Sequence, residues 1–237
     1  MVKTGLWMFR WRSFLPLLVV PLFVWAAYDL WVQGGQASSV TGIVDIVALC
    51  VSICGLMLRA FTVGHAPPGT SGRNTKEQRA TVLNSDGIYS VVRHPLYLAN
   101  YLMFAGFLLA THDYWLMLTC SLVYFIYYER IMMAEEDFLA GKFGKAYEDW
   151  AAVTPAFLPR LGGWRPSSGV LSWRKIIRSE THGLTLIAVV FAVLRLAMWW
   201  IGGGEYPVMW MGFAAVMLVL LTAVVVLKKT TKIFAPR

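Results

Sequence analysis

Residues 87–97 read Gly-Ile-Tyr-Ser-Val-Val-Arg-His-Pro-Leu-Tyr and lead directly into an apolar run, Leu96 to Thr111. The next apolar run, Tyr114 to Met133, ends beside the pair Glu135-Glu136. Ionisable groups are unfavourable near a bilayer, and they usually mark a working site. If the two runs form a helical hairpin, this Arg-His-Pro-x-Tyr stretch and the two carboxylates meet at one membrane depth.

The composition is that of a membrane protein. Of the 237 residues, 58% are hydrophobic and 14% are charged, whereas about a quarter of a soluble domain is charged. A helix needs about 20 apolar residues to cross the hydrocarbon core. We therefore predict an all-α integral membrane helical bundle with about six transmembrane helices. The candidate spans are Ser13–Val32, Val40–Phe61, Leu96–Thr111, Tyr114–Met133, Gly183–Ile201 and Pro207–Leu227.

The positive charges predict the orientation. Lys and Arg precede the first run, follow the sixth, and fill the connections after the second and fourth runs, while the other three connections have none. Positive residues favour the cytoplasmic side, so both termini are expected in the cytoplasm. The net charge of +8 is then a feature of topology and argues against nucleic acid as a partner. We expect an integral protein of a bacterial inner membrane or an endoplasmic-reticulum-type membrane. The first run lacks a small-residue cleavage site, so no cleaved signal peptide is expected.

Some polar residues inside the runs predict structure rather than chemistry. Asp29, Asp45 and Arg195 would lie in the outer third of the membrane, where they are expected to neutralise one another, with a proton or ion path as the alternative. Cys50 and Cys54 read as small core residues. The three cysteines have no metal-ligand spacing, so we predict no metal site and no disulfide framework.

The segments between the runs differ in character. Gly64–Ser85 is rich in Gly, Pro and Asn and reads as a loop, with a short helix within it at Thr75–Val82. Apolar residues recur at helical spacing in Glu135–Trp150, which predicts an interfacial helix that Gly141 and Gly144 weaken. Gly162–Arg178 reads as a basic linker.

The hairpin ends suggest a binding site for a small cationic cofactor. Pro95 fits the first turn of a helix, and Tyr97 would point to the same side as His94. Carboxylates from Glu135 and Glu136 suit a cationic or ribose group, and Tyr rings suit a sulfonium. Taken singly, each residue also has an ordinary role as a helix cap, a solvated charge or an interface anchor.

Taken together, the ordered residues resemble the isoprenylcysteine carboxyl methyltransferase and phospholipid methyltransferase superfamily. The resemblance covers about residues 85–160 and rests on Gly87-x-Tyr89, Arg93-His94-Pro95-x-Tyr97, Glu135-Glu136-x-x-Leu139-x-x-x-Phe143-Gly144-x-x-Tyr147, Pro155 and Pro159. It implies S-adenosyl-L-methionine as cofactor, with contacts from His94, Pro95, Tyr97, Glu135 and Glu136. One departure is Ala99, where the family usually has Gly. We predict a methyltransferase core at residues 1–182 and a two-helix extension at residues 183–237.

The same resemblance implies methyl transfer to a lipid or lipidated acceptor in the cytosolic leaflet. An anionic oxygen needs no general base, whereas an amine must first be neutral. Cationic side chains favour an anionic acceptor, above all a lipid headgroup phosphate. Arg93 and Arg130 are the catalytic candidates, and the substrate-binding candidates are Arg59, Arg73 and Asn100.

Several other functions stay open at this stage. Within the superfamily, the alternatives are a protein-S-isoprenylcysteine carboxyl O-methyltransferase, a phosphatidylethanolamine N-methyltransferase or a non-catalytic accessory protein. Outside it, they are a transporter or an NADPH-dependent protein of the steroid reductase type. The oligomeric state is open as well.

Overall fold

The computed structural model describes residues 2–11, 20–32, 39–67, 80–203 and 205–231. In these ranges the regular structure is helical apart from one bridge between Gly87 and Arg165, so the predicted all-α bundle is confirmed. The α-helices are α1 (Val2–Trp11), α2 (Val20–Val32), α3 (Ser39–His65), α4 (Pro95–Leu109), α5 (Tyr114–Phe143), α6 (Lys145–Val153), α7 (Trp173–Gly202) and α8 (Val208–Thr230). Two short 3-10 helices are η2 (Ile88–Ser90) and η3 (Leu161–Gly163).

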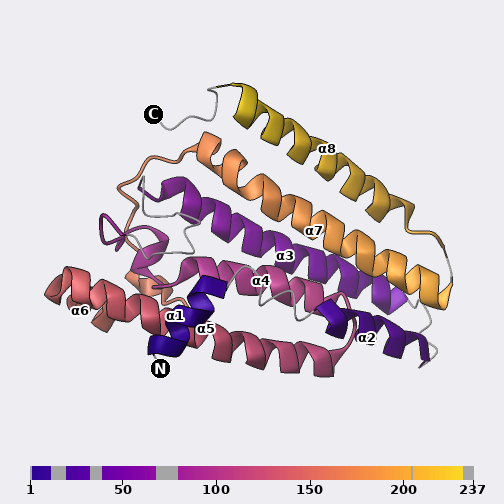
Figure 1. Ribbon diagram of the computed structural model, residues 1–237, viewed down its shortest axis with the longest axis horizontal. Helices are drawn as coiled ribbons and strands as arrows, with labels where there is room; N and C mark the ends of the chain where they lie inside the picture. The colour runs from indigo at the N-terminus through magenta and orange to yellow at the C-terminus, as the bar shows by residue number, and fades with distance from the viewer. Residues whose placement is uncertain (1, 12–19, 33–38, 68–79, 204, 232–237) are drawn as a thin grey trace.

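The long helices lie side by side in the order α8, α7, α3, α4, α5, with roughly parallel axes (Figure 1). The α1 helix packs on α5, and α6 follows at the end of α5. Both α1 and the C-terminal end of α8 lie at the end of the bundle that carries α6. The first and the last described helix therefore reach the same end of the bundle.

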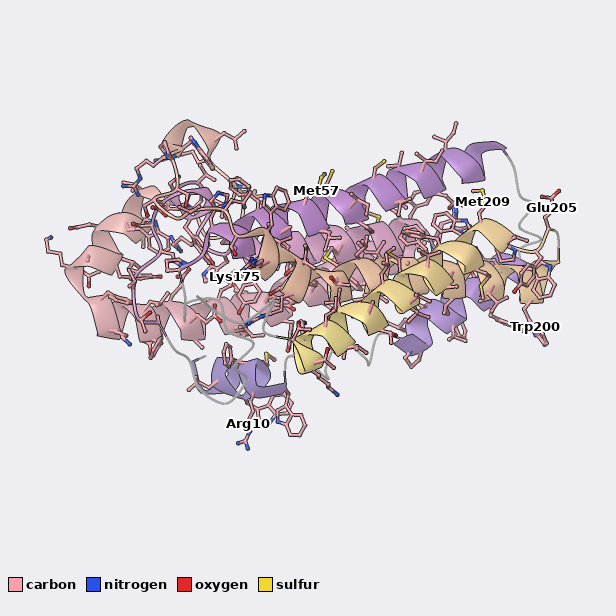
Figure 2. All side chains as sticks on the ribbon, turned by 90° about the horizontal axis from the view of Figure 1, so that it is seen from above. Arg10, Met57, Lys175, Trp200, Glu205 and Met209 are labelled. Atoms are coloured by element: carbon pink, nitrogen blue, oxygen red, sulfur yellow. The ribbon has the colours of Figure 1, made fainter. Side chains whose placement is uncertain are left out.

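Charge differs between the two ends of the bundle. Figure 2 shows Arg10 and Lys175 in the half that contains α6, and both Glu205 and Trp200 at the opposite end. The connections at the Glu205 end carry no Lys or Arg in the sequence. By the positive-inside rule, the α6 end is the expected cytoplasmic end.

The length and the apolar composition of the helices indicate an integral membrane protein. Four described helical segments are long and apolar enough to cross a membrane: Gly42–His65, Tyr114–Phe143, Trp173–Trp200 and Val208–Thr230. They contain most of the predicted second, fourth, fifth and sixth spans. The third predicted span forms the shorter helix Pro95–Leu109, as its short apolar run indicates. Of the first predicted span, only α2 lies within the described residues.

The predicted linker Gly162–Arg178 is wrong in its last third, because α7 already begins at Trp173. The side chain of Ser172 accepts a hydrogen bond from the backbone N–H of Lys175 and caps the new helix. The first turns of α7 carry Arg174, Lys175 and Arg178. Their charge lowers the local hydropathy, so hydropathy alone does not reveal that the helix begins before the apolar run.

The predicted interfacial helix Glu135–Trp150 consists of two helices. The α5 helix continues unbroken to Phe143, and Gly144 ends it with φ +54, a conformation that glycine adopts readily. The α6 helix then restarts at Lys145. Of the predicted short helix Thr75–Val82, residues 75–79 lie outside the described residues and residues 80–82 are not helical.

Of the last two spans, α7 contributes to the central hydrophobic core, whereas α8 packs on the outside of α7. Ile187 and Phe191 of α7 are fully buried in one cluster with Leu56 of α3 and Phe107 of α4. The proposed division at residue 182 therefore falls inside a helix that shares the central core. The α8 helix packs on α7 at a small-residue contact that includes Ala188, Ala192 and Ala214.

Two predictions about polar residues have opposite outcomes. The pairing of Asp45 with Arg195 is confirmed, because Arg195 Nη2 donates to Asp45 Oδ1 and also to the carbonyl of Ala110 at 2.9 Å. His112 Nε2 lies 3.0 Å from the same Asp45 oxygen. The prediction that Cys50 and Cys54 are core residues is wrong, since both are exposed on α3. An outward face of a membrane helix is apolar too, so hydropathy alone does not separate it from the core.

We expect Gly55→Ala to lower the free energy of unfolding by about 1–3 kcal/mol, the usual range for overpacking. A Cβ atom at Gly55 would lie 2.6 Å from the carbonyl oxygen of Ala99 and 2.7 Å from the amide nitrogen of Met103, so α3 and α4 would have to separate. Thermal unfolding in detergent measures the effect. The matched control is Gly42→Ala on the same helix, where a Cβ meets nothing within 4 Å. Equal melting temperatures for the two variants would contradict this packing.

Candidate functional site

The Arg-His-Pro segment is held by the chain that follows α6. The backbone N–H of Arg93 donates to Pro155 O at 2.9 Å, and that of His94 donates to Ala156 O at 3.1 Å. Pro95 then opens α4 at its first position, where a missing N–H has no consequence. The start of α4 and the end of α6, distant in sequence, are thereby fixed to one another.

A second set of contacts holds the residues before this segment. Gly87 N–H donates to Arg165 O at 2.9 Å, and the N–H of Arg165 donates to Ser90 Oγ at 2.9 Å. The indole N–H of Trp150 donates to Tyr89 O at 3.0 Å. Gly87 has φ +55, and a Cβ there would lie 3.0 Å from Ser167 Cβ. Both the backbone conformation and the close packing therefore favour glycine at this position of the motif.

Glu136 organises the cationic side of the site. Its Oε1 accepts from Arg93 Nε at 2.9 Å, lies 2.9 Å from Arg93 Nη2, and lies 2.9 Å from His94 Nε2. Arg93 Nη1 donates to the carbonyls of Ala151 at 2.9 Å and Thr154 at 2.8 Å. Each guanidinium nitrogen of Arg93 therefore has a hydrogen-bond or ion-pair partner. The structure thus gives this predicted catalytic residue an organising position, in which it ties α4 to the ends of α5 and α6.

Glu135 has different neighbours. Its Oε1 accepts from the hydroxyl of Tyr97 at 2.6 Å, and its Oε2 lies 3.7 Å from His94 Nδ1. The rings of His94 and Tyr97 stack with centroids 5.6 Å apart. Tyr97 also contacts the Tyr128 ring at 4.8 Å. The sequence alone could not assign separate roles to the two glutamates, whereas the structure places Glu135 on the aromatic side.

Tyr147, which the motif contains without an assigned role, is buried next to this network. Its hydroxyl oxygen makes no hydrogen bond of normal geometry with any described residue. Burial raises the pKa of the Tyr147 phenol well above its ordinary value, and the Glu136 carboxylate adds to the rise. Burial and the charge of Glu135 likewise raise the pKa of Tyr89. Both phenols are therefore neutral hydrogen-bond donors at physiological pH.

Two of the predicted substrate-binding residues and Arg130, the second catalytic candidate, have other partners among the described residues. Arg59 donates from Nη1 to Asn100 Oδ1 at 2.6 Å and from Nε to Glu180 Oε2 at 2.7 Å. Arg130 lies on α5, where its Nε is 4.0 Å from Glu129 Oε2. Arg73 lies outside the described residues, and its role stays a prediction.

Sequence reasoning missed two parts of the site. Tyr124 and Tyr128 stack with centroids 4.2 Å apart, and the Tyr124 hydroxyl donates to Tyr97 O at 2.8 Å. Their spacing of four from one another, and of seven from Tyr128 to Glu135, places them on one face of α5 and could have revealed them. Glu180 lies just beyond the supposed linker, where no pattern pointed to a site.

The comparisons with known proteins agree with the motif. The family model described as phospholipid methyltransferase matches residues 71–146. No solved structure matches the chain. The matched segment contains Arg93, His94, Pro95, Tyr97, Glu135 and Glu136.

Three curated relatives share part of the chain. The nickel-cobalt-cadmium resistance protein NccN of Alcaligenes xylosoxydans xylosoxydans is 29% identical over 52% of this chain and 60% of its own length. The cobalt-zinc-cadmium resistance protein CzcN of Cupriavidus metallidurans is 33% identical over 48% of this chain and 54% of its own. The protein-S-isoprenylcysteine O-methyltransferase of Schizosaccharomyces pombe is 29% identical over 37% of each chain. The chain thus matches at most about three fifths of any of these relatives. Over the matched residues 71–146, the family match and the shared motif residues support the superfamily of membrane methyltransferases that includes the phospholipid and isoprenylcysteine methyltransferases.

Proposed function

We propose that the protein is an S-adenosylmethionine-dependent methyltransferase that modifies a lipid or lipidated acceptor at the cytosolic leaflet. One observation carries the proposal. Four of the five predicted cofactor residues, His94, Tyr97, Glu135 and Glu136, contact one another inside the family-matched segment, and His94 lies between the two glutamates. The positive charges of the connections support a cytosolic orientation of this end.

The donor set suits the cofactor. S-adenosylmethionine supplies a methyl group bound to a cationic sulfur. Glu135 would hold its amino or ribose groups, and the face of Tyr97 would lie next to the sulfonium. The buried hydroxyl of Tyr147 needs a hydrogen-bond partner, which a polar ligand provides. Glu136 fixes Arg93 and His94, so the wall of the site is set before a ligand enters.

The acceptor we propose carries an anionic oxygen, most simply the phosphate of a lipid headgroup. Such an oxygen attacks without a general base, so alignment and exclusion of water are the tasks left to the protein. Arg130 and Arg59 retain 28% and 23% side-chain exposure and are the described cations that support this acceptor. A carboxylate on a prenylated protein and the amine of phosphatidylethanolamine are the alternatives.

A non-catalytic accessory role is the second candidate, because two of the relatives are named as metal resistance proteins. Among the described residues, no group of three or more His, Cys, Asp or Glu side chains could hold a metal ion. An accessory protein of this kind would keep the helices and would not bind the cofactor.

S-adenosylhomocysteine binding to the detergent-purified protein, measured by calorimetry, tests the proposed function. We expect wild-type binding and at least about tenfold weaker binding by His94→Ala, because His94 contacts Glu135, Glu136 and the Tyr97 ring. The control is His65→Ala at the end of α3, where the ring bonds the carbonyl of Phe61 in its own helix. A folded wild-type protein that does not bind would favour the accessory role.

A further inference from the structure

A second polar cluster joins three helices beside the proposed cofactor site. Arg59 of α3 bonds Asn100 of α4 at 2.6 Å and Glu180 of α7 at 2.7 Å. Glu180 has a side-chain exposure of 5%, and Arg59 of 23%. The Arg59 cation and the Glu180 anion are therefore held at fixed positions, and only Arg59 keeps substantial exposure at the surface of the bundle.

Glu180 is only half satisfied. Its Oε2 accepts from Arg59, whereas its Oε1 is buried and has no hydrogen-bond partner among the described residues. Burying a carboxylate oxygen without a donor is strongly unfavourable, and native structures rarely leave such an atom unpaired without a reason. A ligand group with an N–H or O–H bond would satisfy it.

The position of this cluster relates it to the proposed methyl transfer. Asn100 follows Tyr97 by three residues on α4, so the two side chains are near neighbours on the helix. On the α7 side, a Cβ atom at Gly183 would lie 2.8 Å from Leu56 Cδ1 and 3.5 Å from Glu180 Oε2, so the glycine lets α7 approach α3 at this depth. The cluster thus lies within about one helical turn of the aromatic side of the cofactor site.

We propose that Glu180 is an acceptor-recognition residue, a role that rests on the proposed function. The Arg59 guanidinium donates a hydrogen bond to an oxygen of the headgroup phosphate. Glu180 Oε1 accepts a hydrogen bond from a hydroxyl or ammonium of the same headgroup. The pair selects phosphodiester headgroups that carry such a donor over headgroups that lack one. The α7 helix, outside the family-matched segment 71–146, thereby contributes to acceptor choice.

Native mass spectrometry of the full chain with three lipids of identical acyl chains tests the proposal. The probes are phosphatidylglycerol with hydroxyls, phosphatidylethanolamine with an ammonium, and phosphatidylcholine without a donor. We expect one or both donor-bearing lipids to bind about tenfold tighter than phosphatidylcholine, the effect of one hydrogen bond to a charged group. Glu180→Gln, which replaces the accepting oxygen or turns a donor toward the headgroup, should reduce the preference to about twofold or less.

Glu180→Asp provides a second variant that keeps the charge opposite Arg59 while withdrawing the carboxylate by one methylene. It is expected to lose the preference as well, and it decides the question if Glu180→Gln does not fold. The matched control is Glu205→Gln, an exposed carboxylate just beyond the far end of α7 (Figure 2). Equal binding of all three lipids by the wild type, or an unchanged preference in a folded Glu180 variant, would overturn the proposal.

Binding of S-adenosylhomocysteine by the same samples separates the two levels of inference. Glu180 does not contact the His94 network, so both Glu180 variants should bind S-adenosylhomocysteine within about twofold of wild type. Loss of lipid preference with intact binding supports the acceptor role. A wild type that prefers donor lipids but binds no S-adenosylhomocysteine would refute the methyltransferase and the acceptor role of Glu180 together.

Discussion

Glu136→Ala will weaken S-adenosylhomocysteine binding at least about tenfold and lower the free energy of unfolding by about 3 kcal/mol. The substitution removes the one oxygen that accepts from Arg93 Nε and lies 2.9 Å from both Arg93 Nη2 and His94 Nε2. Arg93 and His94 keep side-chain exposures of only 17% and 6%, so water replaces the lost partner poorly. The released His94 ring would then no longer fix the position of Tyr97.

Two variants calibrate this result. Asp149→Ala removes a carboxylate from a largely exposed pair, Lys145–Asp149, and should change stability by no more than about 1 kcal/mol. Glu136→Gln keeps one acceptor oxygen and should fall between wild type and Glu136→Ala. Calorimetry with S-adenosylhomocysteine and thermal unfolding supply the two measurements. Unchanged affinity in a folded Glu136→Ala protein would exclude Glu136 from the site.

The membrane bundle and the hairpin could be predicted because each depends on a local property of the sequence. The apolar runs indicate helices by length, and Asp113 caps α5 by accepting from the N–H of Leu116 at 2.9 Å. With only a short turn between α4 and α5, His94 and Glu136 had to meet at one end of the hairpin. Their separation of 2.9 Å agrees with that geometry.

The contacts between the start of α4 and the chain around α6 could not be predicted because they link segments that carry no periodic pattern. The bonds from Arg93 to Ala151 O and Thr154 O use backbone carbonyls, which every residue has. A bond to a backbone carbonyl does not depend on the type of the accepting residue, so the sequence does not indicate it. The sequence motif therefore predicted that Arg93 matters, but not that it joins the start of α4 to the ends of α5 and α6.

Glu180 escaped prediction for a different reason. It lies in the charged first turns of α7, and hydropathy places the start of the apolar run at Gly183. A buried carboxylate in such a segment is stabilised by a partner far away in sequence, here Arg59, 121 residues earlier. Pairings of this kind become visible only once the helices have been placed side by side.

Arg195→Ala will destabilise the bundle by about 3–5 kcal/mol, the usual effect of leaving one member of a buried ion pair without its partner. Arg195 and Asp45 retain 12% and 16% side-chain exposure and join α7 to α3 at the end of the bundle remote from the candidate site. The substitution also removes the donor to the carbonyl of Ala110, next to the α4–α5 turn. His112 alone, 3.0 Å from Asp45, would have to compensate the carboxylate, which it does only when protonated.

A double variant distinguishes charge balance from a specific function of Arg195. In Asp45→Asn/Arg195→Met the unpaired charge is absent, and Asn keeps an oxygen for His112, so most of the lost stability should return. The exposed Arg174→Ala on the same helix is the control and should unfold like wild type. Folded Arg195→Ala protein should bind S-adenosylhomocysteine within about twofold of wild type, since the predicted cofactor residues lie at the other end of α4. Normal expression and an unchanged melting temperature for Arg195→Ala would show that the pair does not stabilise the bundle.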